Sequence, residues 1–347
     1  MKIKIGDKLI GGHNPCFIIA EAGINHNGEV KLAEKLIDTA KDSGCDAIKF
    51  QTFKTEELVT ITAPTAKYQR ENTSSGSQYK MLKKLELTNM EFKEIFDYCK
   101  RKKIIFLSTP FDFSSAEFLN KLEVPAFKTS SGDLTNIPLL IQIARYSKPI
   151  ILSTGMSTLH EVQEAVKAIY STGNRKLALL HCTSNYPTKY EDVNLRAIIT
   201  LRKKFNVPVG YSDHTKGIEV AIASVPFGAN IIEKHFTLDR NLPGPDHKTS
   251  AEPKEFKAMV DAIRNVEKSL GTGIKKPQKS EIEIKNVARK SIVAGVDIPK
   301  NTKIAFDMLT IKRPGTGISP IYLSKIVKKK TLANIKKDEL ISWNKIN

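Results

Sequence analysis

Short apolar runs alternate with amphipathic stretches along most of the chain. The runs cover residues 17–23, 47–53, 104–111, 126–133, 149–156, 177–184, 207–215 and 230–239. The stretches between them, for example 31–44, 160–173 and 253–271, carry apolar residues at helical spacing. Continuous apolar strands that alternate with helices indicate a parallel sheet covered by helices on both faces.

Eight strand–helix units favour an α/β fold of the closed (β/α)8 barrel type (a TIM barrel). The alternative, an open doubly wound sheet, would carry a Gly-rich phosphate turn after its first strand, but the turn here reads GINHNG. Helix boundaries are marked by capping-box patterns and by glycines at the expected C-termini. The capping pairs are Thr88–Glu91, Ser114–Glu117 and Thr158–Glu161, and the glycines are Gly44, Gly173 and Gly271.

The pattern changes after the eighth unit. Residues 272–290 are polar and basic, as in a linker, and the segment that follows has short strands and turn residues but little helix. We therefore predict a barrel domain at 1–273, a linker at 274–288 and a small β-rich domain at 289–347. The small domain would be marginally stable alone, so we expect it to pack on a partner surface.

Composition excludes several classes of protein. The chain has 55 Lys and Arg against 37 Asp and Glu, a net charge of +18, but the lysines are spread out and not interleaved with aromatic residues. Solvated faces explain this charge better than nucleic-acid binding does. The four cysteines suit neither a zinc site nor disulfides, and we find neither a signal peptide nor a membrane span, so we expect a cytoplasmic protein that binds no membrane.

The ends of the predicted strands are rich in chemically capable residues, and this is where barrel enzymes place their active sites. Lys49 and Lys128 lie inside otherwise apolar runs, where an unpaired ammonium is costly. They could clamp a phosphate or carboxylate, one could form a Schiff base, or they could pair with Glu21 or Asp133. The nearby hydroxyls of Thr109, Ser131, Ser153 and Ser184 complete a donor-rich rim that suits a phosphorylated substrate.

Two histidines end neighbouring strands. His214 and His235 could bind one metal ion with carboxylate or water completing the shell, although a structural or hydrogen-bonding role is the alternative. For His26 and His181 we expect roles in ordering a loop or in the core.

Nine motifs taken in order resemble the bacterial sialic acid synthases, the N-acetylneuraminate synthase group of nonulosonic acid synthases. They are IIAEAGINHNG, KFQTF, LSTPFD, ILSTGM, LLHCTSNYPT, GYSDHT, EKHFTLD, GPDHKTSAEP and KRPGTGISP. The resemblance implies an enzyme that condenses phosphoenolpyruvate, N-acetylmannosamine and water to N-acetylneuraminate and phosphate. The alternative substrate is 2,4-diacetamido-2,4,6-trideoxymannose, used by legionaminic acid synthases; a Schiff-base aldolase is a further alternative. An antifreeze-like (SAF) C-terminal domain and a domain-swapped homodimer are also implied.

The resemblance assigns roles to particular residues. His214 and His235 are implied as ligands of Mn2+ (Mg2+ or Co2+ being the other options), and Glu21 and Asp246 as contacts to the sugar hydroxyls. The implied phosphoenolpyruvate cradle comprises Lys49, Lys128, Thr109, Ser131, Ser153, Ser184 and Tyr186. Further implied lining residues are Gln51, Phe111 and Ser212, with Arg313 lent by the partner subunit to the acetamido group.

One position departs from the family pattern. The family commonly has Glu after Ser-Gly on the fourth strand, whereas this chain has Asp133, which is one methylene shorter. We expect the proton-transfer role to fall to Asp133 through a bridging water, or to be shared with Glu21.

Overall fold

The computed structural model describes residues 1–73 and 75–347 of the chain. The described residues divide into two compact units, Met1–Gly271 and Thr272–Asn347. The division lies at the start of the segment that we predict to be a linker. Among the helices in the described residues, none is long and apolar enough to cross a membrane.

An eight-stranded parallel sheet forms the centre of the first unit, in the part of the chain that the structure describes. Its hydrogen-bonded order is β5-β4-β3-β10-β9-β8-β7-β6, and β5 also contacts β6, so the sheet curls into a nearly closed barrel. The strands are β3 (Phe17–Gly23), β4 (Ala47–Thr52), β5 (Ile105–Pro110), β6 (Phe127–Thr129), β7 (Ile150–Ser153), β8 (Leu177–Cys182), β9 (Val209–Asp213) and β10 (Ile231–His235). The predicted (β/α)8 barrel is confirmed.

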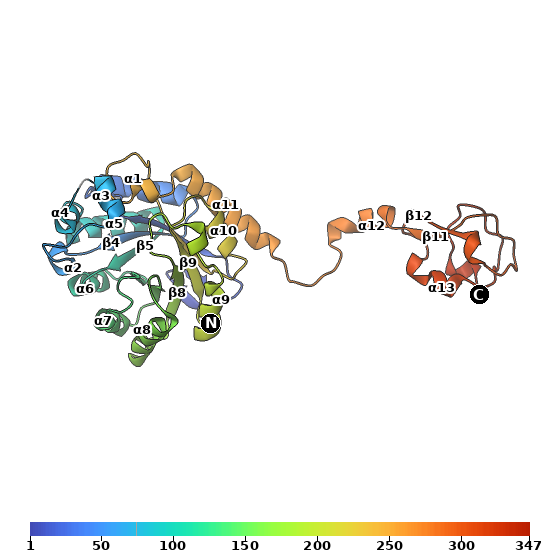
Figure 1. The fold of residues 1–347 in the computed structure, drawn as a ribbon, viewed down its shortest axis with the longest axis horizontal. Helices are drawn as coiled ribbons and strands as arrows, with labels where there is room; N and C mark the ends of the chain where they lie inside the picture. The colour runs from blue at the N-terminus through green and yellow to red at the C-terminus, as the bar shows by residue number, and fades with distance from the viewer. Residues whose placement is uncertain (74) are drawn as a thin grey trace. The chain divides into compact units, whose positions relative to one another are not determined.

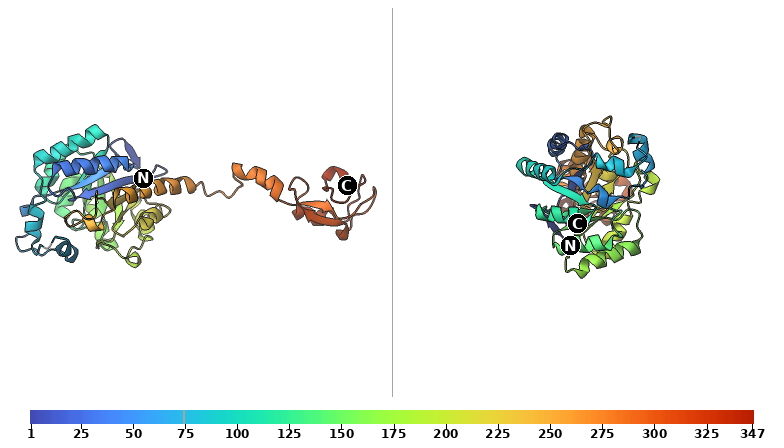
Figure 2. Two further views of the ribbon diagram at one scale, coloured as in Figure 1. Left: turned by 90° about the horizontal axis from the view of Figure 1, so that it is seen from above. Right: turned by 90° about the vertical axis from the view of Figure 1, so that its left-hand side faces the viewer.

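Helices follow the strands and surround them, as Figures 1 and 2 show. They are α1 (Val30–Asp42), α5 (Asn89–Lys102), α6 (Phe113–Lys121), α7 (Ile137–Arg145), α8 (Leu159–Ser171), α9 (Ala197–Phe205), α10 (Glu219–Ser224) and α11 (Pro253–Ser269). Between β4 and α5 the chain inserts three short helices, α2 (Thr55–Leu58), α3 (Lys67–Thr73) and α4 (Gln78–Lys83). This insertion follows the carboxyl end of β4 and so adds residues at that end of the barrel.

Local signals explain most helix boundaries. Both Thr88 and Thr158 form complete capping boxes, and the three predicted C-terminal glycines all have positive φ. The predicted box at Ser114 is wrong, because Asp112 is the N-cap of α6 and accepts from the backbone of Ser115 at 2.6 Å. A carboxylate is a stronger acceptor than a serine hydroxyl, and Asp112 also binds the backbone N–H of Lys54.

Side chains inside the barrel form layers because alternate residues of a strand point to opposite faces. The lower layer is apolar and is closed by the hairpin of β1 (Ile3–Ile5) and β2 (Lys8–Ile10). Its residues are Ile3, Ile5, Ile10, Phe17, Ile19, Ala47, Leu107, Ala126, Ile151, Ala178, Leu180 and Ile231. The intervening residues pack instead against the helices. The next inward positions, toward the strand ends, are therefore held above a dry floor.

The second unit has its own core. Its elements are α12 (Ile282–Ala288), β11 (Ser291–Ala294), β12 (Leu309–Lys312) and α13 (Leu323–Ile326), joined by turns and 3-10 segments. Strands β11 and β12 pair antiparallel, and the core consists of Ile292, Ala294, Ile298, Ile304, Ile318, Ile326, Ile335, Ile341 and Ile346. The predicted linker 274–288 thus contains a helix, α12.

Candidate active site

A charged layer lies directly above the apolar floor of the barrel. Glu21, Lys49, Lys128 and Glu233 each stand two residues after an inward apolar residue of β3, β4, β6 or β10. All four are buried, with exposed fractions of 2–5%. Strand periodicity therefore projects all four charged side chains toward the barrel interior.

Contacts among these four groups form a continuous network. The Lys49 ammonium lies 2.7 Å from one oxygen of Glu21 and 3.8 Å from one of Glu233. Glu233 also lies 3.6 Å from the Lys128 ammonium and accepts a hydrogen bond from Ser212 at 3.0 Å. The two acids thus balance the two lysines, and the open alternative of a Lys49–Glu21 ion pair is found in the structure.

Hydroxyl groups of β5 and β7 extend the network. Lys49 donates to Thr109 at 3.2 Å, and Lys128 donates to Ser153 at 2.7 Å and to the carbonyl oxygen of Thr129 at 3.0 Å. Gln51 donates to the second oxygen of Glu21 at 3.2 Å. The ammonium groups therefore already have acceptors that an incoming anion could replace or join.

Gly155 brings two further hydroxyls together. Its backbone N–H donates to Ser131 at 3.0 Å, and a Cβ at this position would lie 2.3 Å from the Ser184 hydroxyl and 2.8 Å from the Ser131 hydroxyl. A side chain there would force the serine hydroxyls to move. The three groups make a small donor-rich recess beside the lysines, which matches the requirements of a phosphate group.

Burial and charge set the protonation of the layer. Burial raises the pKa of Glu21 to about 7; the negative charge of Glu233 adds to this rise and the positive charge of Lys49 partly offsets it. Burial lowers the pKa of Lys128 despite the nearby carboxylate of Glu233. Burial opposes ionisation of Glu233 too, but the two lysines hold its pKa below the usual value. Glu21 is therefore the acid of the pair that can exchange a proton near neutral pH.

Asp133 lies apart from this network. Its carboxylate accepts from the hydroxyl of Ser130 at 2.6 Å and from the amide of Asn136 at 3.4 Å, in the turn before α7. Burial raises its pKa, and the two local hydrogen bonds oppose the rise. The structure thus brings Glu21, and not Asp133, next to the lysines; the Lys128–Asp133 pair considered from the sequence is not formed.

His214 and His235 lie together at the mouth, with ring centres 5.5 Å apart. The Nδ1 atom of His214 lies 2.8 Å from the carbonyl oxygen of Thr183. A carbonyl can only accept, so Nδ1 carries the proton and Nε2 keeps its lone pair. The Nδ1 atom of His235 is buried without a partner among the described residues, and burial together with the charge of His214 lowers the pKa of this ring.

A divalent metal ion would bind the two imidazoles in their neutral forms. Burial lowers the pKa of His214, but its contacts with Cys182 and Thr183 outweigh burial and raise that pKa above the usual value. Within residues 1–73 and 75–347 there is no cluster of three or more His, Cys, Asp or Glu side chains that could surround a metal. The protein would therefore contribute a pair of ligands and leave the remaining positions to substrate and water.

Aromatic side chains cover the histidines. The ring of Tyr186 lies 4.2 Å from that of His214 and 5.6 Å from that of His235. Tyr68, on the inserted helix α3, stacks on Tyr186 at 5.3 Å. Burial and the charge of Asp246 raise the pKa of Tyr68, and burial raises the pKa of Asp246 to about 6. Asp246 thus lies beside the aromatic residues at the same mouth.

The other predicted residues have varied surroundings. Phe111 packs on a small apolar cluster with Ile24, Phe53 and the insertion. Arg313 belongs to the second unit, where its Nε donates to the carbonyl oxygen of Ala288 at 3.1 Å. Ser212 contacts Glu233, as described above, and therefore supports the charged layer.

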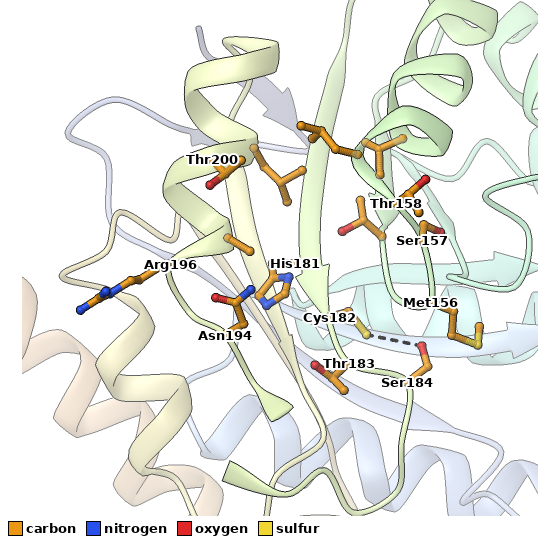
Figure 3. Close-up of a pocket in the computed structure, with 15 residues that line it drawn as sticks. Met156, Ser157, Thr158, His181, Cys182, Thr183, Ser184, Asn194, Arg196 and Thr200 are labelled. Atoms are coloured by element: carbon orange, nitrogen blue, oxygen red, sulfur yellow. Dashed lines mark hydrogen bonds between the residues drawn. The ribbon is translucent and has the colours of Figure 1, made fainter. Parts of the chain in front are cut away.

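A pocket of about 700 Å3 opens beside this site, between the loop after β7 and helix α9 (Figure 3). Cys182, Thr183 and Ser184 line one end of it, and the Cys182 sulfur lies 3.7 Å from Nδ1 of His214. His181 is another lining residue, and its Nε2 lies 2.6 Å from the carbonyl oxygen of Val193. This contact agrees with the loop-ordering role expected for His181.

Three residues of the site, Glu233, Gly155 and Tyr68, have no role assigned from the sequence. Glu233 could have been found from period two, because it lies two residues before His235 and must share its face. The sequence around Gly155 and Tyr68 does not indicate a role in the site. Only the folded chain shows the serine hydroxyls around Gly155 and the stacking of Tyr68 on Tyr186.

The barrel and its charged mouth define the class of protein: an enzyme that handles a phosphorylated anion at the strand ends. Comparison with known proteins agrees. The model of the NeuB family matches residues 36–275 and that of the SAF domain matches residues 289–347. The N,N'-diacetyllegionaminic acid synthase of Campylobacter jejuni is 47% identical over 93% of this chain and 98% of its own length.

Two further comparisons extend this result. The N,N'-diacetyllegionaminic acid synthase of Legionella pneumophila is 46% identical over 98% of this chain and 97% of its own. The crystal structure of N-acetylneuraminic acid (sialic acid) synthetase from Leptospira borgpetersenii is 39% identical, with a TM-score of 0.72 over 82% of this chain and 95% of that one. The chain belongs to the NeuB family. It is a nonulosonic acid synthase, a transferase that condenses phosphoenolpyruvate with a sugar.

Proposed function

We propose that the enzyme condenses phosphoenolpyruvate with 2,4-diacetamido-2,4,6-trideoxymannose and water, which gives N,N'-diacetyllegionaminate and phosphate. Two relatives with this activity in their names are 46–47% identical to the chain. The human and mouse N-acetylneuraminate-9-phosphate synthases are 36% identical. This difference ranks the diacetamido sugar above N-acetylmannosamine, the first sugar suggested by the motifs.

N-acetylmannosamine is the second candidate. It is supported by the Leptospira borgpetersenii sialic acid synthetase, at 39% identity. Both sugars carry an N-acetyl group and react in their open-chain aldehyde form, so both would use the same reacting atoms.

The charged layer is the observation that carries the proposed chemistry. Phosphoenolpyruvate has a carboxylate and a phosphate, and Lys49 and Lys128 present two ammonium groups with Thr109 and Ser153 beside them. In the recess beside the lysines, the hydroxyls of Ser131 and Ser184 add neutral donors, and the Gly155 N–H orients the Ser131 hydroxyl by donating to it. We assign the phosphate to the lysines and this recess, where dense donors in a dry site stabilise the departing dianion.

Glu21 is the proposed proton acceptor. In the reaction, C3 of phosphoenolpyruvate bonds to the sugar aldehyde carbon and the aldehyde oxygen takes up a proton. Water adds to C2, and the resulting intermediate expels phosphate by breaking the C2–O bond, which leaves a ketone. The water must lose a proton when it adds to C2. Glu21, with a pKa of about 7 and an ammonium group 2.7 Å away, is placed to take that proton.

His214 and His235 are the proposed holders of Mn2+, with Mg2+ and Co2+ as the other options. A metal bound there would supply Lewis-acid polarisation of the sugar aldehyde. His214 is oriented by Thr183, and His235 has a buried nitrogen available. Removal of the metal with a chelator is expected to abolish turnover, and added Mn2+ to restore it.

The remaining parts of the proposal rest on the family resemblance. We propose a domain-swapped homodimer in which Arg313 of each chain reaches the acetamido group bound by the other. We also propose a cytoplasmic location. Mixing two impaired variants, Lys128→Met and Arg313→Ala, at a low concentration of phosphoenolpyruvate would restore part of the activity if each mixed dimer contains one intact site.

The experiment for the reaction itself is phosphate release from phosphoenolpyruvate in the presence of Mn2+. Release that depends on the diacetamido sugar, together with a product of the condensed mass by mass spectrometry, would support the proposal. Phosphate release without any sugar, or sugar consumption in the presence of pyruvate alone, would contradict it.

A further inference from the structure

A second buried ion pair lies immediately behind the two histidines. Strands β9 and β10 pair in a register that sets Lys234 opposite Asp213. His235 follows Lys234 in sequence, and His214 follows Asp213. Because neighbouring strand residues point to opposite faces, Lys234 lies on the helix-facing side while His235 faces the mouth.

The pair is closed to solvent and is held by several hydrogen bonds. The Lys234 ammonium lies 2.7 Å from one oxygen of Asp213, and the two side chains have exposed fractions of 3% and 0%. Lys234 also donates to the carbonyl oxygen of Thr215 at 2.8 Å. The other oxygen of Asp213 accepts from the backbone N–H and the hydroxyl of Thr215 at 2.9 and 2.8 Å.

These bonds enclose His214. Its two neighbours in sequence, Asp213 and Thr215, are both tied to Lys234, and Lys234 directly precedes His235. The ring of His214 is fixed separately by its bond to Thr183. The backbone that carries one histidine is thus anchored to the strand that carries the other.

A pair of charges is not needed here for packing. Two apolar side chains of similar volume would fill the same space, and replacing a buried ion pair in this way is often neutral or stabilising. The pair does tie two strand ends together, and it does so directly behind the two histidines.

We propose that Lys234 and Asp213 are positioning residues that hold His214 and His235 at the separation a shared metal ion requires. The proposal rests on the proposed metal site. Metal–ligand distances tolerate only about 0.2 Å, so loosening one histidine against the other weakens binding. Partners behind metal ligands commonly change metal affinity by about 10- to 100-fold.

The test is Mn2+ binding to the metal-free protein, measured from the electron paramagnetic resonance signal of free Mn2+. In the double variant Lys234→Met/Asp213→Val, both charges are removed and most of the apolar volume is kept. We expect the melting temperature to fall, because Thr215 loses the acceptor of its backbone N–H and hydroxyl, while the folded variant binds Mn2+ with a Kd raised about 10- to 100-fold. Arg264→Met is the control, because it removes a 3.1 Å pair with Asp46 at the opposite end of the strands; it should leave the Kd unchanged.

A milder variant covers the case in which the double variant does not fold. Thr215→Val removes one hydrogen bond to Asp213 and keeps the shape of the side chain; it should raise the Kd several-fold. Wild-type affinity in the folded double variant, or in Thr215→Val if only that variant folds, would overturn the positioning role alone. A wild-type protein that binds no Mn2+ would overturn the metal site and this proposal together.

Discussion

Glu21 provides the sharpest test of the electrostatics of the site. It is 2% exposed, and burial raises its pKa from 4.5 to about 7 even though Lys49 lies 2.7 Å away. At about 1.4 kcal/mol for each pKa unit, this rise corresponds to about 3 kcal/mol. A carboxyl group whose pKa is raised on folding stabilises the fold fully below its unfolded pKa. That contribution is lost as the pH rises through the folded pKa of about 7.

The perturbation is Glu21→Gln, which removes the titrating group and keeps its shape. We expect the free energy of unfolding of the wild type, relative to this variant, to fall by about 3 kcal/mol between pH 4.5 and pH 8. The variant also loses the contact with Lys49, which adds a constant offset to this difference in unfolding free energy. The offset is constant because Lys49 stays charged over this pH range: nearby carboxylates outweigh burial and raise the pKa of Lys49 above the usual value. Urea unfolding at a series of pH values measures the difference.

Glu233→Gln is the matched control. Lys128 and Lys49 outweigh burial and lower the pKa of Glu233, so its stabilising contribution is lost only as the pH falls below the usual range of a carboxyl group. The ionisation of Glu233 itself adds no slope between pH 5 and pH 8, but the variant also removes a charge that helps to raise the pKa of Glu21, so its difference curve should fall by less than that of Glu21→Gln. A flat curve for Glu21→Gln would show that Glu21 is ionised throughout, and it would remove the basis for its role as the proton acceptor.

Three other substitutions test separate parts of the site. Lys128→Met should raise the KM for phosphoenolpyruvate by about 10- to 150-fold, because one hydrogen bond to a charged group is lost. Treatment of the wild-type enzyme with pyruvate and borohydride should trap no adduct; a trapped adduct would favour the aldolase. Gly155→Ala should raise the same KM at least about tenfold, since the new Cβ would lie 2.3 Å from a serine hydroxyl; Gly132→Ala, where the nearest atom is 3.5 Å away, should not. Tyr68→Ala should raise the KM for the sugar by about 2- to 10-fold through loss of the stacked ring, while Tyr68→Phe should not; an equal effect on phosphoenolpyruvate would contradict this placement.

The barrel could be predicted because its signals are local. Apolar strands, amphipathic helices and glycines with positive φ after helices each depend on a few neighbouring residues. The error at Ser114 has a physical cause of the same kind: two acceptors stand near one helix start, and the stronger one, Asp112, also binds Lys54 on another segment. Only the fold brings that third group close.

The candidate site was predicted in its outline and not in its pairings. Two lysines in apolar strands require acidic partners, but the sequence does not decide between Glu21 and Asp133. The structure joins Lys49 to Glu21 and Glu233, while Ser130 and Asn136 bind Asp133 in its own turn. Local hydrogen bonds to the Asp133 carboxylate compete with an ion pair across the barrel. The aspartate side chain is one methylene shorter than glutamate, and this favours the local hydrogen bonds.

Tyr68 shows the limit most clearly. Tyr68 lies in the insertion and not at the end of a strand, and the residues around it in sequence do not indicate that α3 places it against Tyr186. Long-range contacts of this type depend on how the insertion folds back, which periodicity does not describe.

The most direct test of the central claim is a competition between the two sugars. Equal concentrations of 2,4-diacetamido-2,4,6-trideoxymannose and N-acetylmannosamine are supplied with phosphoenolpyruvate and Mn2+, and the two nonulosonic acids are quantified by mass spectrometry. The product ratio equals the ratio of the kcat/KM values. We predict an excess of N,N'-diacetyllegionaminate of at least about tenfold, the effect of about 1.4 kcal/mol; an excess of N-acetylneuraminate would contradict the proposed substrate.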